Sequence, residues 1–197
     1  MIKTFLAVAF SALFLNNLIF IKFFGIDSFL GLSKKTGIIT GLGITVTAIL
    51  TVSSFLNYII YKFILLQLNI DFLLTPIFTI VITFVILLLI ILIKKSGSLV
   101  YEFFGKYLPL IVTNSAILGI SLISINLNND PLTSVLFGFF SGLAYMLGLF
   151  IIITIREKLE LSEIPGPFKG IPVALITFGI ITMIFFAFDS GILDFFK

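Results

Sequence analysis

The chain has 197 residues, of which 60% are hydrophobic and 11% are charged. A soluble domain of this length exposes more polar surface, so the composition predicts an integral membrane protein with lipid contacts and no nucleic-acid partner. The chain contains no Cys and no His. Their absence excludes disulfides, thiolate ligands, thiol nucleophiles and imidazole proton shuttles, and we expect no catalytic site within this chain.

Six apolar segments are long enough to cross a bilayer, which requires about 20 mostly apolar residues. They cover residues 4–25, 38–60, 72–93, 108–126, 133–155 and 170–188. The first lacks a convincing signal-peptide cleavage site, so we interpret it as a retained span. The loops are short and carry nearly all the charge. We therefore expect an all-α integral membrane fold in a single domain over residues 1–197.

The basic residues of the loops predict the orientation of the six spans. With six spans both termini lie on one side of the membrane, and that side holds Lys3, Lys62 and Lys197. The opposite side holds Lys34, Lys35, Lys94, Lys95, Lys106, Arg156, Lys158 and Lys169. Because cytoplasmic loops carry an excess of Lys and Arg, the opposite side should be cytoplasmic. Both termini should then lie on the outer side.

A weak internal repeat aligns LFLNNLIF (13–20) with LIVTNSAI (110–117), and it pairs Asn17 with Asn114. Three spans separate these segments, so the two halves would cross the bilayer in opposite directions. This pattern predicts two inverted three-helix halves, about 1–98 and 99–197. In such folds the functional sites lie near the midplane, where helices are interrupted, so we expect breaks in transmembrane helices 1 and 4.

Three asparagines, Asn16, Asn17 and Asn114, fall within predicted spans, where polar groups must be satisfied inside the protein. Two interpretations remain open. Their amides could hydrogen-bond across neighbouring helices and strengthen the packing. Alternatively, they could lie at helix breaks around a functional centre, together with Ser115.

Asp27 lies between apolar runs in FFGIDSFLG. An intramembrane carboxylate suggests a functional site, whereas an N-cap of a short following helix would explain it structurally. Lys22 could extend to the membrane surface or offset the charge of Asp27. The charged segment REKLELSEIPGPFKG (156–170) is expected to be a solvated loop with a rigid turn before the last span.

Several stretches together resemble the RnfA/NqrE family, and within it the RnfA branch. They are LNNLIFIKFFGIDSFLGLSKK (15–35), LPLIVTNSAILGISL (108–122) and IREKLELSEIPGPFKGIPVALITFGI (155–180). The resemblance covers essentially the whole chain. It implies a six-span subunit of an Rnf-type or Na⁺-translocating NADH:quinone reductase-type complex in the bacterial inner membrane, with inverted halves and both termini outside.

The resemblance also implies partners and a cofactor. Family members pair with a RnfE/NqrD-like sister subunit, and the pair holds a [2Fe-2S] cluster at the midplane with cysteines from each subunit. The cluster passes electrons between a flavin or iron–sulfur subunit on the cytoplasmic side and a flavin subunit on the outer side. Electron flow is coupled to movement of Na⁺ or H⁺, so the family acts as part of a translocase.

This sequence departs from the family motifs at both cluster cysteines. The motifs G-x-C-P-F-x-G and T-N-C-A-x-x-G correspond here to residues 25–31 and 113–119, which place Asp27 and Ser115 at the two cysteine positions. Hydroxyl and carboxylate oxygens are poor substitutes for the thiolates that hold iron–sulfur clusters. We therefore expect the cluster to be absent or altered. Asp27, Asn114 and Ser115 form an oxygen-rich set, which suits a hard cation, so a site for Na⁺ or a proton is one explanation and a vestigial site is the other.

Two functions from different classes follow. The first is an RnfA-like subunit of an ion-translocating electron-transport complex, with electron relay through this subunit in doubt. The second is a redox-silent ion or small-solute transporter, or a structural membrane scaffold, derived from the same family.

Overall fold

The computed structural model describes residues 2–25, 36–95, 111–112, 114–126 and 130–190, and within them it contains helices and turns but no strand. The first half comprises α1 (Ile2–Phe10), a π-helical turn (Ser11–Leu15), α3 (Thr36–Ile60), a second π-helical turn (Tyr61–Leu65), α4 (Leu66–Leu68), a 3₁₀ turn (Asp71–Leu73) and α5 (Leu74–Lys95). The second half comprises α8 (Ser115–Asn126), α9 (Pro131–Glu160), a 3₁₀ turn (Gly166–Phe168) and α10 (Ile171–Ser190).

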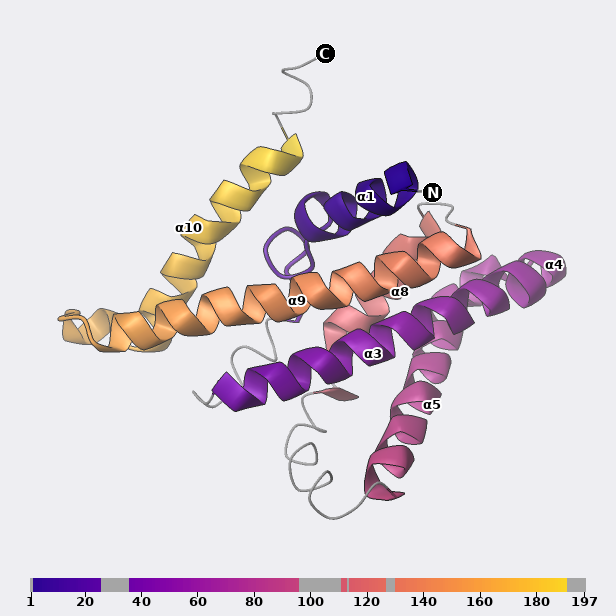
Figure 1. Ribbon diagram of the computed structural model, residues 1–197, viewed down its shortest axis with the longest axis horizontal. Helices are drawn as coiled ribbons and strands as arrows, with labels where there is room; N and C mark the ends of the chain where they lie inside the picture. The colour runs from indigo at the N-terminus through magenta and orange to yellow at the C-terminus, as the bar shows by residue number, and fades with distance from the viewer. Residues whose placement is uncertain (1, 26–35, 96–110, 113, 127–129, 191–197) are drawn as a thin grey trace.

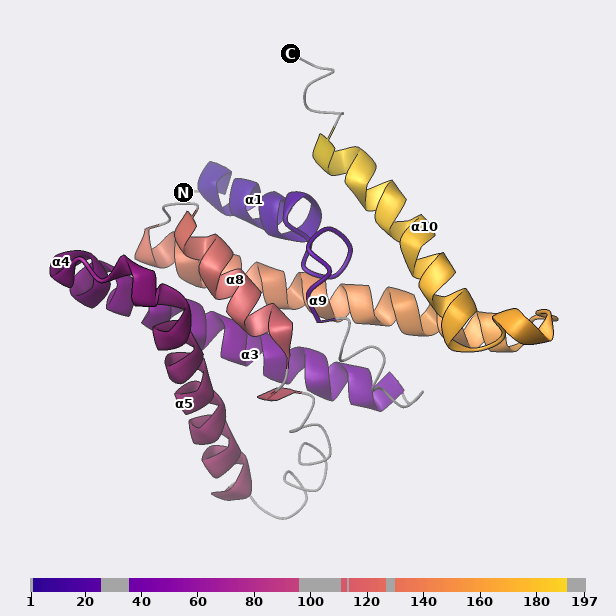
Figure 2. The same cartoon turned by 180° about the vertical axis from the view of Figure 1, so that it is seen from behind.

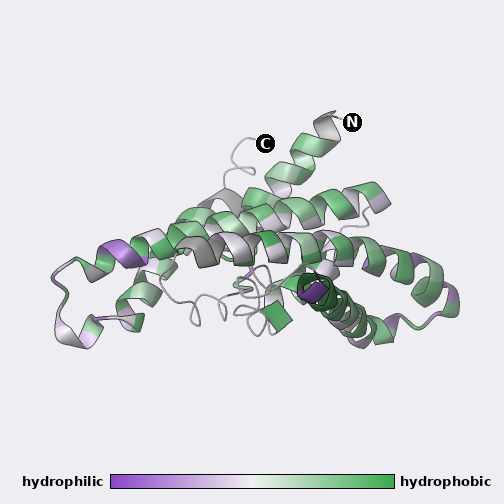
Figure 3. Cartoon of the chain, turned by 60° about the horizontal axis from the view of Figure 1, so that its bottom comes forward, coloured by the Kyte–Doolittle hydropathy of each residue, from purple (hydrophilic) through white to green (hydrophobic). Residues whose placement is uncertain are grey.

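Each predicted span contains an apolar helix, which confirms the all-helical membrane class. Three described helical segments are long and apolar enough to cross a membrane: Thr40–Leu68, Asp71–Lys95 and Pro131–Leu159. Three shorter apolar helices lie in the other predicted spans: Phe5–Leu15, Ser115–Ile125 and Ile171–Phe186. The hydrophobic colouring runs along the helices in Figure 3.

The helix ends follow local sequence signals. Asn69 ends α4 in the left-handed conformation (φ +53°), which Asn tolerates better than most residues. Asp130 is the N-cap of α9 and Pro131 is its first residue, a position where the missing N–H of Pro costs nothing. The predicted solvated loop over 156–170 is confirmed only for residues 161–170, which are exposed except for the half-buried Ile164, because residues 156–160 continue α9.

The antiparallel pair α3 and α9 forms the centre of the molecule and its largest helix–helix interface (Figure 1). Small residues allow the two helices to approach closely, as is common between membrane helices. A Cβ added at Gly142 would lie 2.6 Å from Thr47 Cα, and one added at Gly43 would lie 2.6 Å from Met146 Cγ. Seen from behind, α8 lies against this pair (Figure 2).

The C-terminal helix α10 diverges from α9 after the loop that joins them (Figure 1). Aromatic contacts hold it to the turn that follows the first helix. The ring of Phe20 stacks on Phe185 with centroids 4.5 Å apart, and Phe178 lies 5.8 Å from Phe20 and from Phe23. Residues 17–21 of that turn are buried, so the turn belongs to the core.

Candidate functional site

The helix of the first predicted span ends at Leu15, well before the predicted boundary at residue 25, and turns follow it. Asn17 stabilises this end. Its Oδ1 accepts hydrogen bonds from the backbone N–H groups of Ile19 (3.1 Å) and Phe20 (3.0 Å), and its Nδ2 donates to the carbonyl oxygen of Leu13 (2.8 Å). The buried side chain of Asn17 thus supplies a donor to one carbonyl near the helix end, where carbonyls lack partners within the helix, and an acceptor to two N–H groups of the turn that follows.

Asn114 occupies a similar place in the second half. It precedes α8 directly, and its Oδ1 accepts from the N–H of Ala116 (2.9 Å), which is the bond of an N-cap. Its Nδ2 donates to the hydroxyl oxygen of Tyr145 on α9 (2.9 Å). The two asparagines therefore differ in what their side chains do. Asn17 bonds to backbone groups on both sides of the helix end at Leu15, whereas Asn114 both caps a helix and links two helices.

Gly25 brings the two motif segments together. Its N–H donates to Ser115 Oγ across 90 positions of sequence (3.1 Å). Gly25 has a φ of +82°, which a residue without a Cβ adopts readily. A Cβ there would lie 2.5 Å from a ring carbon of Tyr145. Gly25, Asn114, Ser115 and Tyr145 thus form one contact group, which we call the Gly25–Tyr145 group.

A second close approach fixes the same two segments. The ring of Phe24 lies so close to Gly119 that a Cβ there would be 2.4 Å from a ring carbon. The glycine of the second motif therefore provides the space that Phe24 fills. Asn16 remains in its own segment, where its Nδ2 donates to Ser11 Oγ (3.0 Å). Lys22 is exposed.

Not every predicted site residue can be placed. Asp27 and Thr113 lie outside the described residues. Ser115 is exposed, whereas Asn114 is 6% exposed. Among the residues that the structure describes, there is no cluster of three or more acidic, His or Cys side chains that could hold a metal ion.

Tyr145 is the residue of this group that sequence reasoning missed. It is completely buried, and its hydroxyl is the partner of Asn114. The one feature of the sequence that could have pointed to Tyr145 is its position in an apolar span, where a phenol hydroxyl needs a hydrogen-bond partner. The identity of that partner depends on how α8 and α9 pack.

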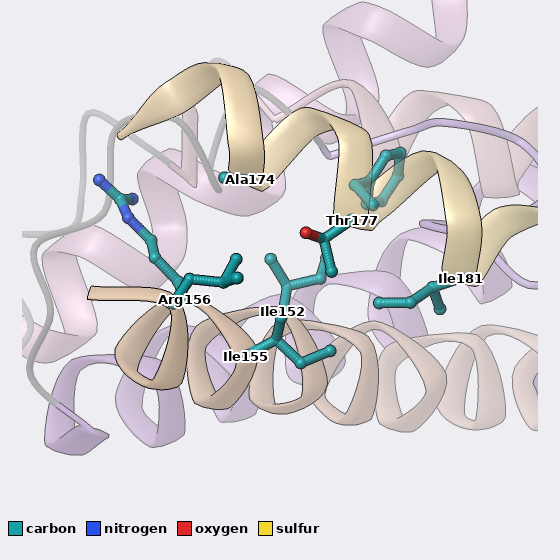
Figure 4. A pocket seen from close by; sticks show the side chains of 8 residues that line it. Ile152, Ile155, Arg156, Ala174, Thr177 and Ile181 are labelled. Carbon is teal, nitrogen blue, oxygen red and sulfur yellow. The ribbon is translucent and has the colours of Figure 1, made fainter. Parts of the chain in front are cut away.

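A small, partly open pocket lies between α9 and α10 (Figure 4). Its lining is mainly apolar, with Ile152, Ile155 and Ile181, and Arg156 lies at one end. Thr177 is the other polar side chain of the lining. The pocket offers no set of convergent polar groups, so we do not place the functional site there.

We expect Tyr145→Phe to destabilise the protein more than Tyr58→Phe. Loss of the Tyr145 hydroxyl leaves Asn114 Nδ2 buried without its partner, which costs about 1–3 kcal/mol. Tyr58 is the matched control because its hydroxyl accepts from the exposed Lys62 Nζ (3.0 Å). Thermal unfolding of both variants in the same detergent tests this. Equal losses of thermal stability would contradict a structural role for the Asn114–Tyr145 bond.

Comparison with known proteins identifies the family. Residues 5–192 match the family model described as Rnf-Nqr subunit, membrane protein. The chain is 37% identical over 180 residues to the A subunit of the ion-translocating oxidoreductase complex of Actinobacillus pleuropneumoniae serotype 5b, covering 91% of this chain and 93% of the relative. The protein of the same name from Escherichia coli O1:K1 is 36% identical over 175 residues, covering 89% and 91% of the two chains. This chain therefore belongs to the Rnf-Nqr family of membrane subunits.

Proposed function

We propose that this chain is the A-type membrane subunit of an ion-translocating oxidoreductase complex in a bacterial inner membrane. The observation that carries the proposal is the contact between Gly25 and Ser115. These residues belong to the two motifs of the family, and the chain joins them although 90 positions separate them. The nearly full-length similarity to subunits of that name supports the same assignment.

In this proposal six spans form two inverted halves, both termini lie on the outer side, and the chain packs beside a RnfE/NqrD-like sister subunit. One feature supports the six spans and a second supports the inverted halves. Each predicted span contains an apolar helix. The paired asparagines Asn17 and Asn114 each accept a hydrogen bond from the backbone N–H two residues further on. The excess of basic residues in the loops between spans supports the orientation.

The side chains that this chain offers as metal ligands do not fit the [2Fe-2S] cluster that the family resemblance implies. The chain has no cysteine, and Ser115 Oγ, at one cysteine position, accepts the N–H of Gly25. A neutral hydroxyl gives up its proton far less readily than a thiol, and clusters are held by thiolates. We therefore infer that this subunit supplies no normal cluster ligands, and that electrons pass it by another route or not at all.

Ser115 also favours a second candidate function. A member of the family whose cysteine positions carry oxygen side chains could transport an ion or small solute without electron transfer. Asp27, Asn114 and Ser115 would then offer oxygen ligands, which hard cations prefer. The two functions differ in whether ion movement requires an electron donor.

Purification of the tagged chain from its native membrane tests the proposal. We expect flavin subunits and a sister membrane subunit to co-purify, and the reconstituted complex to take up ions only when an electron donor is supplied. Deletion of this chain should abolish that uptake. Ion uptake without a donor, by a preparation that lacks flavin subunits, would instead support the redox-silent transporter.

A further inference from the structure

Four buried polar side chains lie at one end of the central helices and have no part in the Gly25–Tyr145 group. They are Ser54 and Asn57 on α3, Ser124 on α8 and Ser134 on α9, and we call them the Ser–Asn cluster. Each is at most 2% exposed. Among the described atoms, none of the three hydroxyl oxygens has a hydrogen-bond partner, and neither does Nδ2 or Oδ1 of Asn57.

The packing of α3 against α9 places Ser134 beside Asn57. A Cβ added at Gly138 would lie 2.6 Å from Ser54 Oγ, which fixes the contact of the two helices. Ser134 lies one turn before Gly138 on the same face of α9, and Asn57 lies nearly one turn beyond Ser54 on α3. Because the helices are antiparallel, the step from Gly138 back to Ser134 and the step from Ser54 on to Asn57 run toward the same end of the helix pair.

Ser124, on α8, lies at the same height along α9 as Ser134. The bond from Asn114 to Tyr145 fixes where α8 begins along α9. The end of α8 lies close to the beginning of α9, so the two helices also run in opposite directions (Figures 1 and 2). Ten residues after Asn114, Ser124 therefore lies opposite the part of α9 about ten residues before Tyr145, where Ser134 is found.

The cluster requires a ligand that both donates and accepts hydrogen bonds. A serine in a helix can bond to a carbonyl one turn back, as Ser121 does to Ile117 (3.0 Å). Such bonds leave the amide of Asn57 unsatisfied, and a buried polar group without a partner costs about 1–3 kcal/mol. A cation would satisfy Oδ1 but not Nδ2, and an anion the reverse. Water satisfies both, and buried waters typically bridge such groups.

We propose that the Ser–Asn cluster is an internal water-binding site that connects α3, α8 and α9. The site lies near a polar surface. Tyr58, next to Asn57 in sequence, accepts a hydrogen bond from the exposed Lys62, and the exposed Asp130 lies one turn before Ser134. This inference goes beyond the proposed function and stands without it, because it depends only on the packing of three helices.

The same face of α9 continues toward the Gly25–Tyr145 group. Ser141 is completely buried, and its hydroxyl has no partner among the described atoms. It lies two turns beyond Ser134, and Tyr145 lies one turn further. The polar and small side chains of this face thus extend over about 16 Å of helix, at 1.5 Å per residue, so bound water could extend from the cluster toward Tyr145.

The absence of cysteine from the chain allows a direct test. Ser134→Cys and Ser124→Cys each introduce the only thiol of the chain, and infrared spectroscopy follows its S–H stretch as D₂O converts it to S–D. The spectrum of the unmodified complex is subtracted to remove the thiols of partner subunits. The matched controls are Ser53→Cys and Ser121→Cys, because these serines are equally buried but bond to a carbonyl of their own helix.

We expect both cluster thiols to exchange at least about tenfold faster than both control thiols, since exchange at a dry position requires local opening of the structure. Asn57→Leu, combined with Ser134→Cys, should slow the exchange of the cluster thiol toward the control rate. Equal rates at cluster and control positions, whether fast or slow, would overturn the proposal. Rapid exchange that is unaffected by Asn57→Leu would also overturn it. Neither readout depends on electron or ion transport.

Discussion

Gly25→Ala is expected to lower the apparent free energy of unfolding by roughly 2–4 kcal/mol. A residue with a Cβ pays about 1–2 kcal/mol for the left-handed conformation that Gly25 adopts. The new methyl group would also lie 2.5 Å from the Tyr145 ring, and overpacking a closely packed site typically costs about 1–3 kcal/mol. Tyr145 is completely buried, so it has little room to move. Thermal unfolding of the purified complex measures the effect.

Gly179→Ala is the matched control for this substitution. Gly179 lies in α10, and a Cβ there would meet nothing within 4 Å. Alanine forms helices better than glycine, by about 1 kcal/mol in a helix interior, so the control should be neutral or slightly stabilising. If Gly25→Ala were as harmless as Gly179→Ala, the close contact between Gly25 and Tyr145 would be wrong.

Gly25→Ala should also disturb the alignment of the two family motifs. Movement of Tyr145 away from the added methyl group would strain its hydrogen bond to Asn114, and displacement of Gly25 would strain the one to Ser115. If the substitution affects packing alone, the variant should still assemble with the sister subunit. If the Gly25–Tyr145 group is the functional centre, the complex that assembles should lose ion transport as well as stability.

The helices could be predicted from the sequence because long apolar runs in a membrane allow little else. The point at which the first helix ends was harder to predict. Asn16 and Asn17 indicated where a break could occur, but the predicted span still extended to residue 25, whereas the helix ends at Leu15. Turns in that segment are tolerated because its backbone is buried in protein, and Asn17 bonds to the backbone on both sides of the break.

The contacts of the candidate site could be predicted only in part. Asn114 and Ser115 were found because they are polar residues in an apolar span. Tyr145 was not found, since its role depends on the packing of α8 against α9. Asn57 satisfies the criterion that selected Asn114, and it was overlooked because no repeat or family motif includes it. The sequence shows that Asn57 is a polar residue in an apolar span. Only the structure shows that its side chain has no hydrogen-bond partner among the described atoms.

The replacement of the family cysteines leads to the last prediction. We expect the double variant Asp27→Cys/Ser115→Cys, purified with its sister subunit, to bind iron and acid-labile sulfide in near-stoichiometric amounts, whereas the unmodified complex binds none at this interface. The family resemblance assigns the other two cysteines to the sister subunit. Two added thiolates would then complete the set of four that a [2Fe-2S] cluster requires.

The proper control has the same number of added thiols, with one of them misplaced. Asp27→Cys/Ser121→Cys supplies two cysteines on the same two segments, but Ser121 lies nearly two turns along α8 from Ser115. It should gain no cluster, because cluster assembly requires four converging thiolates and not merely available thiols. Iron and sulfide in the unmodified complex at this interface would show that oxygen ligands suffice, and our assignment of an altered centre would then be wrong. If only the restored double variant acquires the visible absorption of a cluster, Ser115 occupies a ligand position whose thiolate this chain has lost.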